Sequence, residues 1–286
     1  MYKLLTLLFS LLSVTISAQN ELTEKAQPIV QEGKLLYKSE MASWYGTDLF
    51  LKMYKDRENV GGYFSYADKE LATCIFFSKG EAPKVIGEII FDSTYNVQTA
   101  KTNFTERMFT NYETDLYIIR KIAFAEIHTD TLFKTYKNSN LNLIPLISNE
   151  EKKVYVLTGP HQNGVVIFGN DYLLVFDKDN QLLSKKMLHK NIIPINYEVN
   201  EPEDKQTVGA MHSHLPETGD LITATDICTL MLYEKFTKWK QHHVFSKNYV
   251  SIWNCLTNEL LVVPMSTVEK IYNDQEKKKK KKTKDE

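Results

Sequence analysis

The sequence lacks the features that mark several protein classes. It has three cysteines and no Cys-x-x-Cys spacing, so it offers neither a thiolate zinc site nor a thioredoxin-like centre. Its 35 basic and 36 acidic residues nearly cancel, so we predict no nucleic-acid partner. It has no Gly-x-Ser-x-Gly, Walker-type or Gly-x-Gly-x-x-Gly motif, which leaves the serine hydrolase and nucleotide-binding classes without support.

The one long apolar run lies at the N-terminus and is typical of a secretory signal. Lys3 supplies the positive charge of the n-region, residues 4–16 form the apolar h-region, and Ser17-Ala18-Gln19 is the small-residue cleavage site. We therefore expect residues 1–19 to be a signal peptide and the chain to be exported, as a periplasmic or secreted protein. No cysteine follows that would carry a lipid anchor, and no later run is long enough for a transmembrane segment in the mature chain.

The three cysteines form an odd set for an exported protein. Cys228 and Cys255 are the pair that we would test first for a disulfide, which would leave Cys74 as a spare thiol. Each of the three lies in an apolar stretch, so buried free thiols are an equally open interpretation.

The C-terminus carries a block of positive charge. Residues 276–286 contain seven lysines and three acids, a net charge of +4. A block of like charge repels itself, so we expect residues 273–286 to be a disordered, solvated tail. It could alternatively touch an acidic polymer or anionic lipid.

The remaining chain alternates helical and strand-like patterns and predicts an α+β fold, with a mixed or antiparallel sheet and flanking helices. Apolar spacing of three and four residues predicts a helix over residues 21–51, interrupted around Gly33, and another over residues 105–126 with Met108 and Phe109 on its apolar side. Shorter runs predict strands at 63–66, 72–77 and 84–91.

After residue 140 the pattern changes to short β-branched and aromatic runs separated by turns. Runs at 154–157, 165–168, 172–176 and 182–188 predict an antiparallel meander. A loop over 200–206, a strand over 207–211, a helix over 223–240 and strands at 244–245, 250–253 and 259–263 follow. We place a soft boundary near residue 145, between an N-terminal α+β region (20–145) of unknown role and a C-terminal domain (146–272).

One segment has the pattern of a metal site. His212 and His214 are two apart on a predicted strand, so both imidazoles point to one face. A turn with Pro216 and Gly219 then returns the chain, and Asp226 stands near the start of the next helix. Two imidazoles and a carboxylate suit a divalent ion such as Zn²⁺, and three protein ligands leave a fourth position for water. We predict His212, His214 and Asp226 as metal ligands.

This pattern resembles the JAMM/MPN metalloprotease family, whose hallmark is His-(Ser/Thr)-His-Pro, about seven residues, and Ser-x-x-Asp. His212, Ser213, His214 and Asp226 match it, with Thr223 in place of the serine. The order of strand, helix and short strands extends the resemblance over residues 154–263. It implies zinc held by the three ligands, Thr223 in a catalytic role towards the metal-bound water, and hydrolysis of a peptide or isopeptide bond.

The sequence departs from the family at three points. Leu215 replaces the proline, the loop is one residue longer, and the glutamate expected as general base has no counterpart in residues 154–164. Glu126, Glu150 and Glu151 are the nearest acids upstream. Glu217, in the loop after the histidine pair, is the other candidate base.

Two functions therefore remain open. The first is an exported zinc metallopeptidase acting on a peptide. The second is a catalytically inactive module that keeps the fold, lacks the base and binds an envelope-associated ligand. Each half of the motif also has a structural explanation, because Thr223-x-x-Asp226 is a helix capping box.

Other histidines and acids are secondary candidates. His161 and His189 lie in the predicted meander, and either is a candidate fourth ligand or substrate contact. His242-His243 follows the helix, where imidazoles favour the negative end of the helix dipole. Asp171 and Asp177 lie on turns and lack the alternating ladder of a calcium loop.

Overall fold

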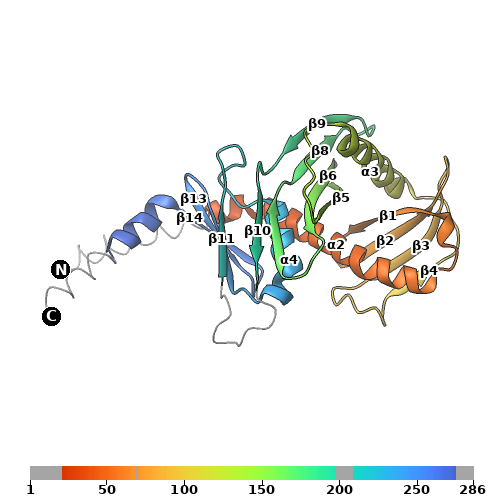
Figure 1. The fold of residues 1–286 in the computed structure, drawn as a ribbon, viewed down its shortest axis with the longest axis horizontal. Coiled ribbons are helices and arrows are strands. Elements are labelled where there is room, and N and C mark those ends of the chain that lie inside the picture. Colours follow the sequence, from red (N-terminus) through yellow and green to blue (C-terminus); the bar gives the residue numbers. More distant parts are fainter. Residues whose placement is uncertain (1–20, 69, 198–208, 275–286) are drawn as a thin grey trace.

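The computed structural model describes residues 21–68, 70–197 and 209–274 and shows an α+β fold with mainly antiparallel sheets and three long helices among these residues (Figure 1). The expected signal peptide, the loop at 200–206 and the lysine block at 277–282 lie outside the described residues. Within the described ranges, no helix has both the length and the apolar character needed to cross a bilayer.

Helix α2 (Gln27–Met53) is the longest element, and Gly33 does not interrupt it. The expected break is wrong because the glycine serves a packing contact instead. A Cβ added at Gly33 would lie 2.7 Å from the Cβ of Ile227 on helix α4 (Ala224–Thr237), so the missing side chain lets the two helices approach closely. Pro28, in the first turn, is compatible with a helix start because it needs no backbone N–H there.

The first sheet confirms the three predicted strands and adds a fourth. Its strands pair antiparallel in chain order: β1 (Val60–Ala67), β2 (Ala72–Ser78), β3 (Val85–Phe91) and β4 (Lys101–Asn103). Helix α2 packs on this sheet, where Phe50 stacks on Phe76 of β2 with ring centroids 3.8 Å apart. The three residues of β4 are polar and exposed, so they lack the apolar alternation that predicts a strand.

Helix α3 (Asn111–Thr129) starts later than the predicted residue 105. Thr110 caps it and forms a capping box with Glu113, which also binds the Arg107 guanidinium with Nη1 2.7 Å from Oε2. Residues 105–109 therefore lie before the helix. Met108, expected on its apolar side, is exposed.

The predicted meander is correct in its strands but wrong in its pairing. The second sheet has the order β5-β6-β8-β9, while β7 (Val165–Gly169) pairs with β10 (Ile192–Asn196) as a separate ribbon. The four strands of the sheet are β5 (Ser139–Ser148), β6 (Glu151–Pro160), β8 (Tyr172–Phe176) and β9 (Leu182–Met187). The boundary predicted near residue 145 falls inside β5, which pairs with β6 along its length.

The third sheet carries the histidine pair. Its strands are β11 (Gly209–Ser213), β12 (Gln241–Phe245), β13 (Tyr249–Asn254) and β14 (Glu259–Pro264). Strands β11 and β12 are parallel, and α4 is the crossover between them, while the other pairs are antiparallel. The order of strand, helix and three strands is the order that the sequence patterns predicted.

Helices α2 and α4 lie against each other in the middle of the molecule. All residues from Ala224 to Leu232 are buried, as expected for a helix that is covered on every side. One core cluster joins residues of α2, the first two sheets and α4.

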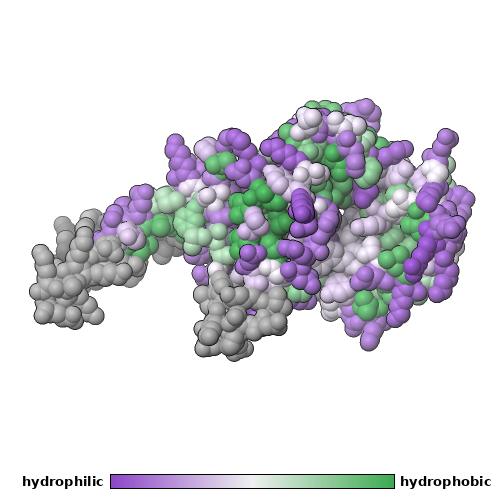
Figure 2. Space-filling view, in the orientation of Figure 1, coloured by the Kyte–Doolittle hydropathy of each residue, from purple (hydrophilic) through white to green (hydrophobic). Residues whose placement is uncertain are grey.

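The three cysteines are buried free thiols, so the disulfide between Cys228 and Cys255 is not formed. On the face shown in Figure 2, polar residues surround an apolar area near β10 and α4.

Candidate metal centre

The two histidines of the motif project from one face of β11 and its continuation. His212 and His214 are buried, whereas Ser213 between them is exposed, as strand alternation requires. The N–H of His214 donates to the carbonyl of Phe245 on β12 at 2.8 Å and so continues the parallel pairing one residue past the strand. The sheet therefore holds both imidazoles toward the start of α4.

Asp226 lies in the first turn of α4 and reaches the same point. Its Oδ2 accepts from the backbone N–H of Thr223 at 2.9 Å and from the Thr223 hydroxyl at 2.8 Å. The capping box and the metal-ligand set are thus not alternatives, because one carboxylate takes part in both. Its Oδ1 is buried and accepts no hydrogen bond.

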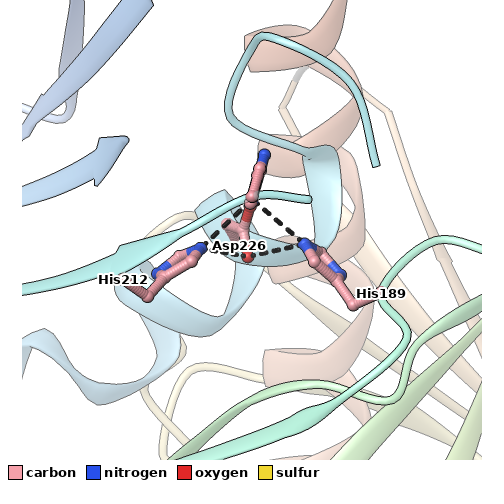
Figure 3. Close-up of side chains that lie close together, drawn as sticks. His189, His212 and Asp226 are labelled. Carbon is pink, nitrogen blue, oxygen red and sulfur yellow. Dashed lines mark hydrogen bonds and ion pairs between the residues drawn. The ribbon is translucent and has the colours of Figure 1, made fainter. Parts of the chain in front are cut away.

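A third histidine, His189, completes the group. It follows β9 and lies across Asp226 from His212, with both rings turned toward the carboxylate (Figure 3). His189, His212, His214 and Asp226 each offer a ligand atom, and these four atoms lie within 4.8 Å of one another. The structure therefore joins the three predicted ligands and adds a fourth that the sequence analysis held as one of two secondary candidates.

The spacing of the ligand atoms fits a small divalent ion. The Nε2 of His214 lies 3.2 Å from that of His189, 3.1 Å from that of His212 and 3.1 Å from Oδ2 of Asp226. Oδ1 of Asp226 is 3.5 Å from Nε2 of both His189 and His212. A tetrahedron with metal–nitrogen bonds of about 2.0 Å has edges of about 3.3 Å. With Oδ1 of Asp226 as its ligand atom, four of the six pairs of ligand atoms lie near this edge length.

Neighbouring groups leave the Nε2 atoms free to bind a metal. Nδ1 of His212 lies 2.8 Å from Nε2 of His242, so a proton on that Nδ1 leaves the lone pair of His212 Nε2 directed at the group. Phe168 fixes both rings, with ring centroids 5.0 Å from His212 and 4.8 Å from His242. Nδ1 of His189 lies 3.4 Å from Oδ2 of Asp171, a carboxylate–histidine pair of the kind that orients metal ligands.

The electrostatics of the group agree with this assignment. Burial alone would raise the pKa of Asp226, but the charge of His189 and the hydrogen bonds from His189 and His214 hold it well below the usual value, so the carboxylate is ionised. Burial lowers the pKa of His212 to about 4 and that of His242 to about 3, which keeps both rings neutral at pH 7. Burial opposes protonation of His189 as well, but Asp226 and Asp171 raise its pKa to about 10, so His189 is protonated in the metal-free group and releases that proton when it binds a metal.

The other residues that the sequence analysis singled out are not ligands in the four-residue group. Thr223 contacts the group through its bonds to Asp226, and its catalytic role stays a prediction. Glu217 is exposed in the turn after the histidine pair. Among the described residues, no glutamate belongs to the group. Glu126 pairs with Lys185 and Glu151 with Lys153, and His161 is exposed.

His242 and Asp171 are the site residues that the sequence analysis assigned other roles. His242 was expected at the end of a helix, but α4 ends at Thr237 and His242 lies on β12, two residues before Val244, the register partner of His212. The His-x-His spacing gives no sign of either residue. Asp171 meets His189 because β8 and β9 pair antiparallel, with Tyr172 opposite Met187 and the N–H of Leu188 donating to the Asp171 carbonyl at 2.7 Å.

No family model, curated protein or solved structure matches this chain.

Proposed function

We propose that this protein is a zinc-binding protein in which His189, His212, His214 and Asp226 hold the ion in a closed, four-ligand site. The observation that carries the proposal is the position of His189. It supplies a fourth ligand at the place that a three-ligand catalytic site would leave to water. The four side chains are 0–5% exposed, so the centre is shielded from solvent.

A closed site supports a structural role for the metal. The ligands come from three segments: the link after β9, strand β11, and the first turn of α4. A bound ion at such a site contributes its binding free energy to folding. Together with the N-terminal signal pattern, this favours an exported, non-catalytic module of JAMM/MPN-like architecture that binds a peptide or another envelope-associated ligand.

Elemental analysis of the purified full chain tests the metal proposal. We expect about one zinc per chain and no stoichiometric zinc in His212→Ala or His189→Ala. His128→Ala is the matched control, because His128 is exposed on α3 and bonds only the carbonyl of Phe124. Wild-type protein that takes up no zinc from a zinc-buffered solution would overturn the proposal.

Peptide hydrolysis is the second candidate, and the convergence of His212, His214 and Asp226 favours it. It requires a ligand position to open, and His189 is the ligand that the family pattern does not include. Zinc-loaded wild type and His189→Ala should both be assayed on a broad peptide panel. Cleavage by wild type that disappears in His212→Ala would replace the structural role with a catalytic one. Absence of cleavage by either protein would support the closed site.

A further inference from the structure

A second pocket lies away from the metal centre, between α2, β1, β5 and α4. It encloses about 390 Å³, within the range of small-molecule sites. Its lining includes four aromatic side chains, Trp44, Tyr63, Tyr233 and Phe236, and the amides of Asn140 and Asn142. None of the four metal-binding residues lines it.

Glu40, on α2, is the only acidic residue among those that line this pocket. It is 7% exposed, and within the described part of the chain its carboxylate makes no hydrogen bond and no ion pair. The adjacent hydroxyls are engaged elsewhere, since Ser39 donates to the carbonyl of Ser65 and Ser43 bonds the Ser65 hydroxyl, each at 2.9 Å. A buried carboxylate without a partner is costly, so it is neutralised either by a proton or by a cation that enters the pocket.

Arg120 is the cation that acts on Glu40, and no ion pair joins the two side chains in the described residues. Arg120 on α3 acts on it at longer range, but its guanidinium lies over the ring of Tyr63, 5.9 Å from the centroid. Burial raises the pKa of Glu40 to about 7 despite Arg120. The other titratable groups that interact with it are neutral at pH 7: Tyr63, Cys74, Cys228 and Tyr233.

The aromatic and amide side chains of the lining suit the parts of an amine ligand that do not pair with Glu40. Trp44 and Tyr233 pack edge to face, with ring centroids 6.1 Å apart, and offer the aromatic faces that attract cations. Asn140, in the same lining, donates to Asn142 at 2.7 Å. The free ends of both amides lie over Gly159, where a Cβ would come within 3.1 Å of Asn142 Nδ2. The glycine keeps the space beside these amides open.

We propose that this pocket binds a small organic cation, whose amine or ammonium group pairs with Glu40 and contacts the rings of Trp44 and Tyr233. Asn140 and Asn142 hydrogen-bond the rest of the ligand. The proposal is independent of the metal centre, because the two sites share no residue.

Titration of the full-length protein by calorimetry and by ligand-observed NMR tests the proposal. The probes are 1,4-diaminobutane and choline, with 1,4-butanediol as the neutral counterpart of the first. We expect both cations to bind wild type and the diol not to bind. Glu40→Gln keeps the shape of the side chain and should weaken cation binding at least about tenfold. Trp44→Ala should weaken it as well.

Asp48→Asn is the matched control, because Asp48 is an exposed acid on the same helix and its substitution makes the same change in charge. Its affinity for both cations should equal that of wild type. Three results would overturn the proposal: equal binding of the diol, unchanged affinity in Glu40→Gln, or no binding of either cation up to about 10 mM, weaker than most specific ligands.

Discussion

Asp226 shows how much one side chain can do at a helix start. Its Oδ2 satisfies the backbone N–H of Thr223 and the Thr223 hydroxyl, while its Oδ1 faces the imidazoles of His189 and His212. Because the carboxylate is fixed by the cap, it needs no reorganisation to meet the histidines.

Asp171 is the residue whose role is best tested by a change of charge alone. Asp171→Asn keeps an acceptor for the N–H of Thr158, which Oδ1 accepts at 3.1 Å, but removes the negative charge beside Nδ1 of His189. We expect zinc affinity to fall about 10- to 100-fold, the usual cost of losing such a partner. Competition with a chromophoric chelator measures it.

Asp179→Asn serves as the control for this variant, because Asp179 is an exposed acid that pairs with Lys178. It should bind zinc as wild type does. Equal affinity in Asp171→Asn and wild type would show that His189 does not depend on this carboxylate.

Glu40 predicts a dependence of stability on pH. Burial raises its pKa from 4.5 in the unfolded chain to about 7 in the folded protein. As pH rises from about 4.5 to about 7, the unfolded chain releases a proton that the folded protein keeps, so stability falls by about 3 kcal/mol in total and then stays level. Glu40→Gln removes this loss.

Urea unfolding at pH 4.5 and pH 8 measures the effect. At pH 8 we expect Glu40→Gln to be more stable than wild type by about 3 kcal/mol, and near pH 4.5 the two should be equal. A difference of the same size at both pH values would mean that the gain comes from packing and not from the proton.

At the scale of elements, helices α2 and α4 approach each other closely where they cross at Gly33 and Ile227. Gly33→Val should destabilise the protein by about 1–3 kcal/mol, because the added methyl groups push the helices apart. Valine is no worse than glycine as a helix former, so the loss would come from the contact alone. Gln31→Val, on an exposed position of the same helix, is the control, and chemical denaturation measures both.

Local pattern predicted most elements but few of their partners. Alternating or apolar runs marked β1, β2 and β3 and the strands of the third sheet within a few residues, because each has a face or a run that must be buried. Strand β7 is buried along its whole length, so its sequence does not tell which neighbour it pairs with. Gly169 and Asn170, both with positive φ, redirect the chain after it.

In the candidate metal centre, too, local sequence predicted some of the residues and the tertiary fold determined another. His212, His214 and Asp226 were predictable, since one strand, one turn and one helix cap bring them together. His189 arrives from a different sheet, 23 positions before His212, and only the tertiary fold brings it to Asp226. The spacing of residues along the sequence therefore does not predict the contact between His189 and Asp226.

At the scale of the whole molecule, the centre links segments that the backbone pairs separately. His189 follows the second sheet, while His212 belongs to the third. Removal of zinc with a chelator should therefore lower the melting temperature, by the equivalent of about 4 kcal/mol if free zinc had been a thousandfold above its Kd. Calorimetry with and without the chelator measures it, and His189→Ala should not respond to the chelator.

The position of helix α2 determines whether the protein can be expressed as two separate fragments. The helix lies against the first sheet through Phe50 and against α4 through Gly33, so it covers apolar surface in both halves of the chain. An expressed fragment of residues 139–272, which keeps β5 whole, would carry Ile227 uncovered, and we expect it to collect in inclusion bodies. Co-expression with residues 20–138 should restore soluble material as a two-piece complementation pair.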